Sequence, residues 1–131
     1  MQHSFFFDGN SKKIGWVIQS NKQIFEQQRE HAEIYFDKVT SLQSKYIALQ
    51  VGLFWGIGKF IIKNEDHVDI QIDDHTMFDH LSGEKKVTDV FIKNRTEFIL
   101  KFITQRKLKV SYELIDSKNN LSSELIKSKG A

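Results

Sequence analysis

The segment 40–60 constrains the fold of this chain more than any other part of the sequence. Its small and apolar residues recur at three- and four-residue steps, which predicts one long helix with Ser41 available as the N-terminal cap. The recurring positions are Leu42, Tyr46, Leu49, Leu53, Gly56 and Phe60. Further apolar residues lie off this stripe, namely Ile47, Val51, Phe54 and Trp55. A helix that is apolar on more than one side must be buried on each of those sides, so we expect it to pack between a sheet and other elements.

The residues before this helix favour strands. An aromatic run at 4–8 ends in the turn-forming cluster 8–10, and a second β-rich run follows at 14–19. The segment 23–36 fits both a helix, because of its Gln and Glu residues, and a strand, because of its Ile, Phe and Tyr residues. The periodicity leaves both interpretations open.

After the long helix, strands and helices alternate. Residues 68–73 show the two-residue apolar alternation of a half-buried strand that ends in two acids, and 108–114 repeats the alternation. A short helix at 76–81 stops at Ser82-Gly83, and we expect further helices at 88–104 and 121–127. The predicted apolar side of the helix 88–104 consists of Val90, Phe91, Phe98, Ile99 and Phe102. The predicted element order is therefore three strands, a helix, a strand, two helices, a strand and a helix.

Bulk properties restrict the function classes only broadly. With 131 residues, the chain is predicted to form one domain, 1–131. A net charge of +2 and a pI near 8.8 permit a polyanionic partner without indicating one. The chain has no cysteine, its opening residues do not resemble a signal peptide, and its apolar runs are too short to span a bilayer. We therefore expect a cytoplasmic protein with no membrane segment.

The order and spacing of these segments, over essentially the whole chain, resemble the ribonuclease H type 1 family. Phe7-Asp8-Gly9 is similar to the end of the family's first strand, and segment 40–49 matches its main-helix pattern at Tyr46, Ala48 and Leu49. Asp73 follows the fourth strand as in the family, and the C-terminal motif of the family fits at Asn119 and Leu125. The resemblance implies an α/β fold with a five-stranded mixed central sheet, its first three strands antiparallel, flanked by helices.

The family hydrolyses the RNA strand of an RNA/DNA hybrid with two divalent ions held by four carboxylates. The resemblance places Asp8 and Asp73 at two catalytic and metal-binding positions, at the ends of adjacent central strands. Lys45 stands at the position of the helix glutamate, and Ser123 stands at the position of the last aspartate. We expect Lys45 to form an ion pair with Asp8 or Asp73, and we expect weakened binding of Mg²⁺ or Mn²⁺.

Three neighbouring residues are candidates to replace the lost ligands. We interpret Asp74 as a helix cap, Glu124 as a solvated surface acid and His75 as an exposed polar residue. The alternative, in which one or more of them rebuilds a metal site, stays open at this point. His75 in particular would suit a softer ion such as Mn²⁺.

The resemblance also implies a nucleic-acid-binding surface. Thr40 and Ser41 occupy positions where the family's polar residues meet the hybrid, and Asn10, beside the first aspartate, is expected to join them in contacting phosphate or sugar. Trp16 and Trp55 are expected in the core. The chain is thus predicted to be a ribonuclease H-like domain that binds nucleic acid, such as an RNA/DNA hybrid, with absent or impaired hydrolysis. Two alternatives remain: a fold repurposed as a protein-interaction or scaffold module, and an active hybrid endonuclease with a rearranged metal site.

Overall fold

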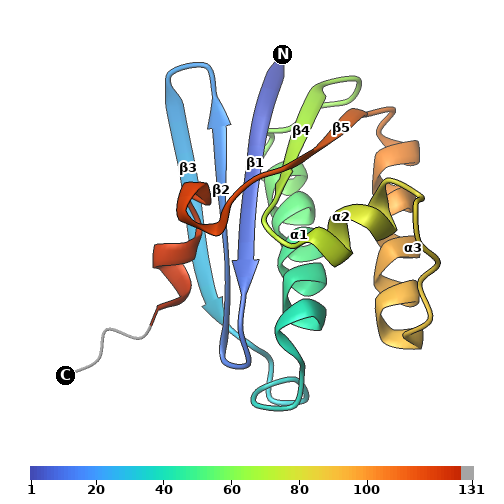
Figure 1. The fold of residues 1–131 in the computed structure, drawn as a ribbon. Coiled ribbons are helices and arrows are strands. Elements are labelled where there is room, and N and C mark those ends of the chain that lie inside the picture. Colours follow the sequence, from blue (N-terminus) through green and yellow to red (C-terminus); the bar gives the residue numbers. More distant parts are fainter. Residues whose placement is uncertain (128–131) are drawn as a thin grey trace.

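The computed structural model, which describes residues 1–127, has a five-stranded mixed sheet in the order β3-β2-β1-β4-β5 (Figure 1). The strands are β1 (Gln2–Gly9), β2 (Lys13–Ser20), β3 (Gln23–Glu30), β4 (His67–Ile72) and β5 (Lys109–Leu114). β1, β2 and β3 pair antiparallel, whereas β4 runs parallel to both β1 and β5. This arrangement confirms the predicted fold class.

The ambiguous segment 23–36 contains a strand, β3, which pairs with β2 along its whole length. β3 lies at the edge of the sheet, and all of its residues are exposed except Phe25, which is half-buried. An edge strand with so little burial has no need of the apolar alternation that identifies a half-buried strand. The sequence pattern was therefore unable to separate strand from helix here.

The helices are α1 (Ser41–Gly58), α2 (His75–Leu81) and α3 (Val90–Gln105). α1 packs on β1 and β2, and α3 packs against α1 (Figure 1). Thr40, not the predicted Ser41, caps α1: its side chain accepts a hydrogen bond from the Gln43 amide at 3.1 Å, and the Gln43 side chain accepts one from the Thr40 amide at 3.0 Å. No helix in the described part of the chain is long and apolar enough to cross a membrane.

The apolar sides of the two long helices differ from the prediction in part. Trp16 is fully buried and Trp55 is half-buried, but Phe54 on α1 is 63% exposed. On α3 the buried residues are Ile92 and Ile99, while Val90 is 70% exposed. α3 contacts the rest of the core mainly through α1, so only a narrow stripe of α3 is covered.

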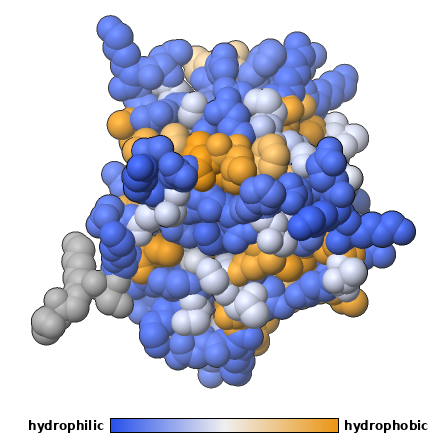
Figure 2. Space-filling model, in the orientation of Figure 1, coloured by the Kyte–Doolittle hydropathy of each residue, from blue (hydrophilic) through white to orange (hydrophobic). Residues whose placement is uncertain are grey.

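The predicted helix 121–127 is wrong. The chain forms two short 3-10 turns, η1 (Ser117–Asn119) and η2 (Ser123–Ile126), and crosses the face of the sheet opposite α1 (Figure 1). The Asn120 side chain accepts hydrogen bonds from both the amide and the hydroxyl of Ser122, and side-chain bonds of this kind compete with helix formation. On this side of the molecule hydrophilic residues predominate, and apolar ones gather in separate small patches (Figure 2).

α1 lies so close to the sheet that a glycine is required at the contact. A methyl group at Gly52 would lie 2.6 Å from the ring of Phe5 and 2.9 Å from that of Trp16. Both rings are fully buried in the core. The close approach sets the height of α1 above β1 and β2, and with it the position of the side chains at the start of the helix.

We predict that Gly52→Ala lowers the free energy of unfolding by about 1–3 kcal/mol, because the added methyl group overpacks the core. Gly58→Ala, in the last turn of the same helix, is the matched control, since a Cβ there meets nothing within 4 Å. The control is expected to be neutral or slightly stabilising. Urea unfolding followed by circular dichroism measures both effects, and equal stability of the two variants would contradict the close packing.

Candidate functional site

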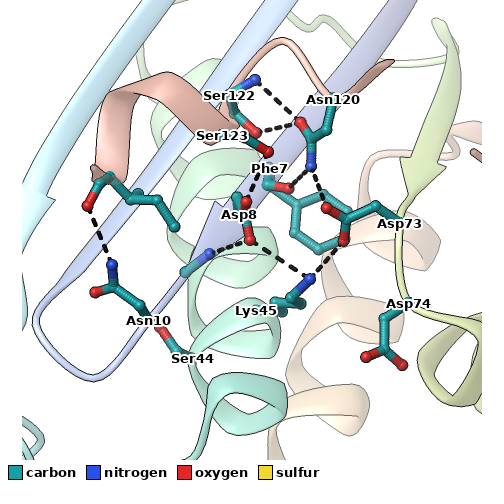
Figure 3. Close-up of polar contacts among 12 residues, drawn as sticks. Phe7, Asp8, Asn10, Ser44, Lys45, Asp73, Asp74, Asn120, Ser122 and Ser123 are labelled. Carbon is teal, nitrogen blue, oxygen red and sulfur yellow. Dashed lines mark hydrogen bonds and ion pairs between the residues drawn. The ribbon is translucent and has the colours of Figure 1, made fainter. Parts of the chain in front are cut away.

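Asp8 and Asp73 lie side by side where β1 and β4 end (Figure 3). The parallel register pairs Phe6 with Gln71, and two residues further along it reaches the two aspartates. Their side chains are only 11% and 2% exposed, respectively. Two ionised carboxylates so close and so little solvated repel each other, so the arrangement needs a compensating positive charge.

Lys45 supplies that charge from the second turn of α1. Its ammonium nitrogen lies 2.6 Å from Asp73 Oδ1 and 3.5 Å from Asp8 Oδ1, and its side chain is only 13% exposed. The predicted ion pair is confirmed, and it joins Lys45 to both aspartates. One residue thereby links α1 to the two central strands of the sheet (Figure 3).

The environment keeps Lys45 protonated. Burial lowers the pKa of its ammonium group, but the hydrogen bond to Asp73 and the charges of Asp8, Asp73 and Asp74 outweigh burial and raise that pKa above its ordinary value. The side chain therefore carries its full positive charge throughout the physiological pH range.

The C-terminal segment supplies neutral donors to the same carboxylates. Ser123 Oγ donates to Asp8 Oδ2 at 2.8 Å, and Asn120 Nδ2 donates to Asp73 Oδ2 at 3.0 Å. Gly9 N donates to Asp8 Oδ1 at 2.8 Å. Together with the bond from Lys45, these contacts give each of the four carboxylate oxygens a hydrogen bond from the protein (Figure 3).

Asn120 is the site residue that sequence reasoning missed. The resemblance places the C-terminal motif at Asn119, yet Asn120 is the buried residue whose side-chain amide donates to Asp73 and, at 2.8 Å, to the Phe7 carbonyl oxygen. The Asn-x-Ser spacing from Asn120 to Ser122 is a local signal for such a turn, because an Asn side chain can accept from the backbone two residues on. The contact to Asp73 itself has no local signal.

The three candidate replacement ligands form their contacts with residues other than Asp8, Lys45 and Asp73. Asp74 caps α2 by accepting from the Met77 amide at 2.9 Å, the 73% exposed His75 side chain pairs with Asp79, and the 79% exposed Glu124 side chain pairs with Lys127. These contacts agree with the interpretation of a cap, an exposed polar residue and a surface acid. Within residues 1–127, no three His, Asp or Glu side chains are placed to hold a metal ion together.

The predicted nucleic-acid-binding residues do not contact the two aspartates. Asn10 Oδ1 accepts from the amides of Lys12 and Lys13, and Asn10 Nδ2 donates to the Ile126 carbonyl at 3.1 Å. Asn10 thus shapes the turn between β1 and β2 and holds η2 in place. Thr40 and Ser41 are both exposed at the start of α1, and Thr40 also serves as its cap.

No protein-family model matches the sequence, and no curated protein matches it either. Solved structures of ribonucleases H do match the fold. The ribonuclease H1 of the archaeon Halobacterium salinarum superposes with a TM-score of 0.77 at 18% identity, over 95% of this chain and 96% of that one. The N-terminal ribonuclease H domain of a Mycobacterium tuberculosis protein gives 0.75 at 16% identity, over 91% and 85%.

A ribonuclease H1 isolated from compost, in complex with an RNA/DNA hybrid, gives a TM-score of 0.67 at 18% identity, over 95% of this chain and 91% of that one. The likeness extends over nearly the full length of each chain. The fold of this protein is therefore ribonuclease H-like.

We predict that Lys45→Met lowers the free energy of unfolding by about 3 kcal/mol, because it leaves two buried carboxylates without their counter-charge. Lys93→Met, at an exposed position of α3, is the matched control and is expected to change stability by less than about 0.5 kcal/mol. Chemical unfolding at neutral pH measures the difference. If both variants lose the same small amount, the ion pair does not hold the site together.

Proposed function

We propose that this protein is a nucleic-acid-binding domain of ribonuclease H-like fold in which metal-dependent hydrolysis of RNA/DNA hybrids is absent or impaired. The observation that carries the proposal is the position of Lys45, whose ammonium group lies between Asp8 and Asp73. A fixed positive charge from the protein stands beside the carboxylates that, by the resemblance, would hold the divalent ions.

The residues present do not fit a Mg²⁺ or Mn²⁺ pair. Such ions need several oxygen ligands with free lone pairs, and sites of this kind gather carboxylates from different elements. Here two carboxylates remain, and each of their oxygens accepts a hydrogen bond from Lys45, Asn120, Ser123 or Gly9. A divalent ion would have to displace Lys45 and leave a buried ammonium beside it, which costs electrostatic energy in this poorly solvated place.

Support for nucleic-acid binding is independent of catalysis. The compost ribonuclease H1 with this fold was solved in complex with an RNA/DNA hybrid. In this chain Thr40 and Ser41 lie exposed at the start of α1, one turn before Lys45, where a sugar or phosphate group can reach the helix N-terminus. We propose that these two residues, with Asn10 at the neighbouring turn, form part of the contact surface.

The test combines binding and cleavage on one substrate. A fluorescent RNA/DNA hybrid is expected to bind the protein with an affinity that falls as salt rises, because phosphate contacts release counterions. Ser41→Glu should weaken binding by placing a negative charge against the backbone, whereas Asn94→Glu on exposed α3 should leave it unchanged. The same hybrid, incubated with Mg²⁺ or Mn²⁺, is expected to stay intact on a denaturing gel.

Two results would contradict different parts of the proposal. Efficient metal-dependent cleavage would mean that the site works in a rearranged form. Failure to bind hybrid, duplex or single-stranded nucleic acid would favour the alternative in which the fold serves as a protein-interaction module.

A further inference from the structure

An apolar groove lies at the end of the molecule opposite Asp8 and Asp73, where the C-terminal ends of α1 and α3 meet. We call it the α1/α3 groove. Its apolar lining consists of Phe54, Ile57, Phe60, Ile62 and Phe102. The rings of Phe54 and Phe102 contact each other, with centroids 5.7 Å apart. About 14 Å of helix separates Phe54, the groove residue of α1 nearest in sequence to Lys45, from Lys45, and the groove has no lining residue in common with the Asp8–Lys45–Asp73 cluster.

Phe54 also borders a second, smaller depression. That depression is lined by Val51 and Trp55 and shares Gly58 with the α1/α3 groove. Phe54 is 63% exposed and forms the ridge between the two. Two adjacent apolar depressions separated by one ring suit a partner that presents successive side chains, as a peptide does.

Every charged residue that lines the two depressions is a cation. Lys63 and Arg106 line the α1/α3 groove, and Arg29 and Lys59 line the second depression. None of the four forms an ion pair with another residue of the described chain, 1–127. A whole chain with a net charge of only +2 thus places four uncompensated cations around one apolar surface.

Phe60 carries two unfavourable features at the groove. Its backbone has φ of +60°, in the left-handed region that glycine adopts most easily, and its side chain is 79% exposed. The hydrogen bonds that end α1 run between backbone atoms only, and none of them needs an aromatic side chain at Phe60. The amide of Phe60 donates to the Ile57 carbonyl, and the amides of Ile61 and Ile62 donate to the Gly56 carbonyl. Neither the helix end nor the core accounts for an aromatic residue at this position.

We propose that the α1/α3 groove and the adjoining depression dock an acidic peptide segment of another protein, one that carries bulky apolar side chains between its carboxylates. The apolar side chains fill the depressions on either side of Phe54, with Phe60 closing over one of them. The carboxylates of the peptide form ion pairs with the four cations that line the two depressions, Arg29, Lys59, Lys63 and Arg106. A binding role of this kind goes beyond the nucleic-acid function and does not depend on it.

The experiment uses the full chain and a fluorescein-labelled probe peptide in which Phe and Leu alternate with Asp and Glu. Fluorescence anisotropy is expected to show binding that weakens with salt, as exposed charge pairs require. Phe54→Ser and the double variant Lys63→Glu/Arg106→Glu should each weaken binding by about tenfold or more. Ile24→Ser, at a 59% exposed apolar position on β3, and Lys93→Glu are the matched controls and should bind as the parent protein does.

Phe60→Gly separates binding from folding. Glycine relieves the left-handed backbone, so the thermal midpoint should rise or stay the same, while affinity for the probe falls by about tenfold. A role confined to folding would produce the opposite result, with a lower midpoint and unchanged binding.

Several results would overturn the proposal. These are failure of the parent protein to bind the probe, equal binding of a probe in which Asp and Glu are replaced by Asn and Gln, and unchanged binding after Phe60→Gly. Binding of anionic phosphatidylglycerol vesicles in place of the peptide would identify a lipid surface instead. Reversible dimerisation through the groove, seen by sedimentation velocity and lost in Phe54→Ser, would identify a second copy of this chain as the occupant.

Discussion

The ammonium group of Lys45 lies between two carboxylates that the fold itself brings together. β1 and β4 run parallel and end at the same edge, so Asp8 and Asp73 become neighbours whatever else the chain does. Lys45 reaches them because Gly52 lets α1 lie directly on the sheet. The charge balance at this point therefore ties the main helix to the two central strands, and the rest of the site is arranged around it.

The C-terminal segment completes this arrangement without adding charge. Asn120 donates to Asp73 Oδ2 and Ser123 donates to Asp8 Oδ2, so this segment satisfies the carboxylates with neutral hydrogen-bond donors. The same fold can thus keep its geometry while its chemistry changes, because architecture is set by strand order and packing and reactivity is set by a few side chains. Lys45 contributes a positive charge to the local field at this point, whereas an acidic side chain there would contribute a negative one.

Sequence patterns predicted those features that depend on local periodicity and on strand ends. The alternation in 68–73 identified β4, and the acids at the ends of β1 and β4 were correctly expected to be neighbours. β3 is exposed on both faces, so its sequence lacks the alternation of apolar and polar residues that identifies a half-buried strand. The segment 121–127 was wrongly predicted to be a helix. The hydrogen bonds from Ser122 to the Asn120 side chain compete with helix formation, and their formation depends on side-chain geometry that residue types alone do not give. Long-range contacts such as Asn120 to Asp73 have no signature in one sequence.

A crystal structure of the protein in excess Mn²⁺ tests the central claim most directly, because anomalous scattering locates the ion without any assumption about activity. We predict no manganese peak near Asp8 and Asp73, with Lys45 remaining between them. The double variant Lys45→Glu/Ser123→Asp, treated in the same way, should show manganese bound there, since it gives the site two further carboxylates. A manganese ion bound to both aspartates of the unaltered protein, with Lys45 displaced, would contradict the account.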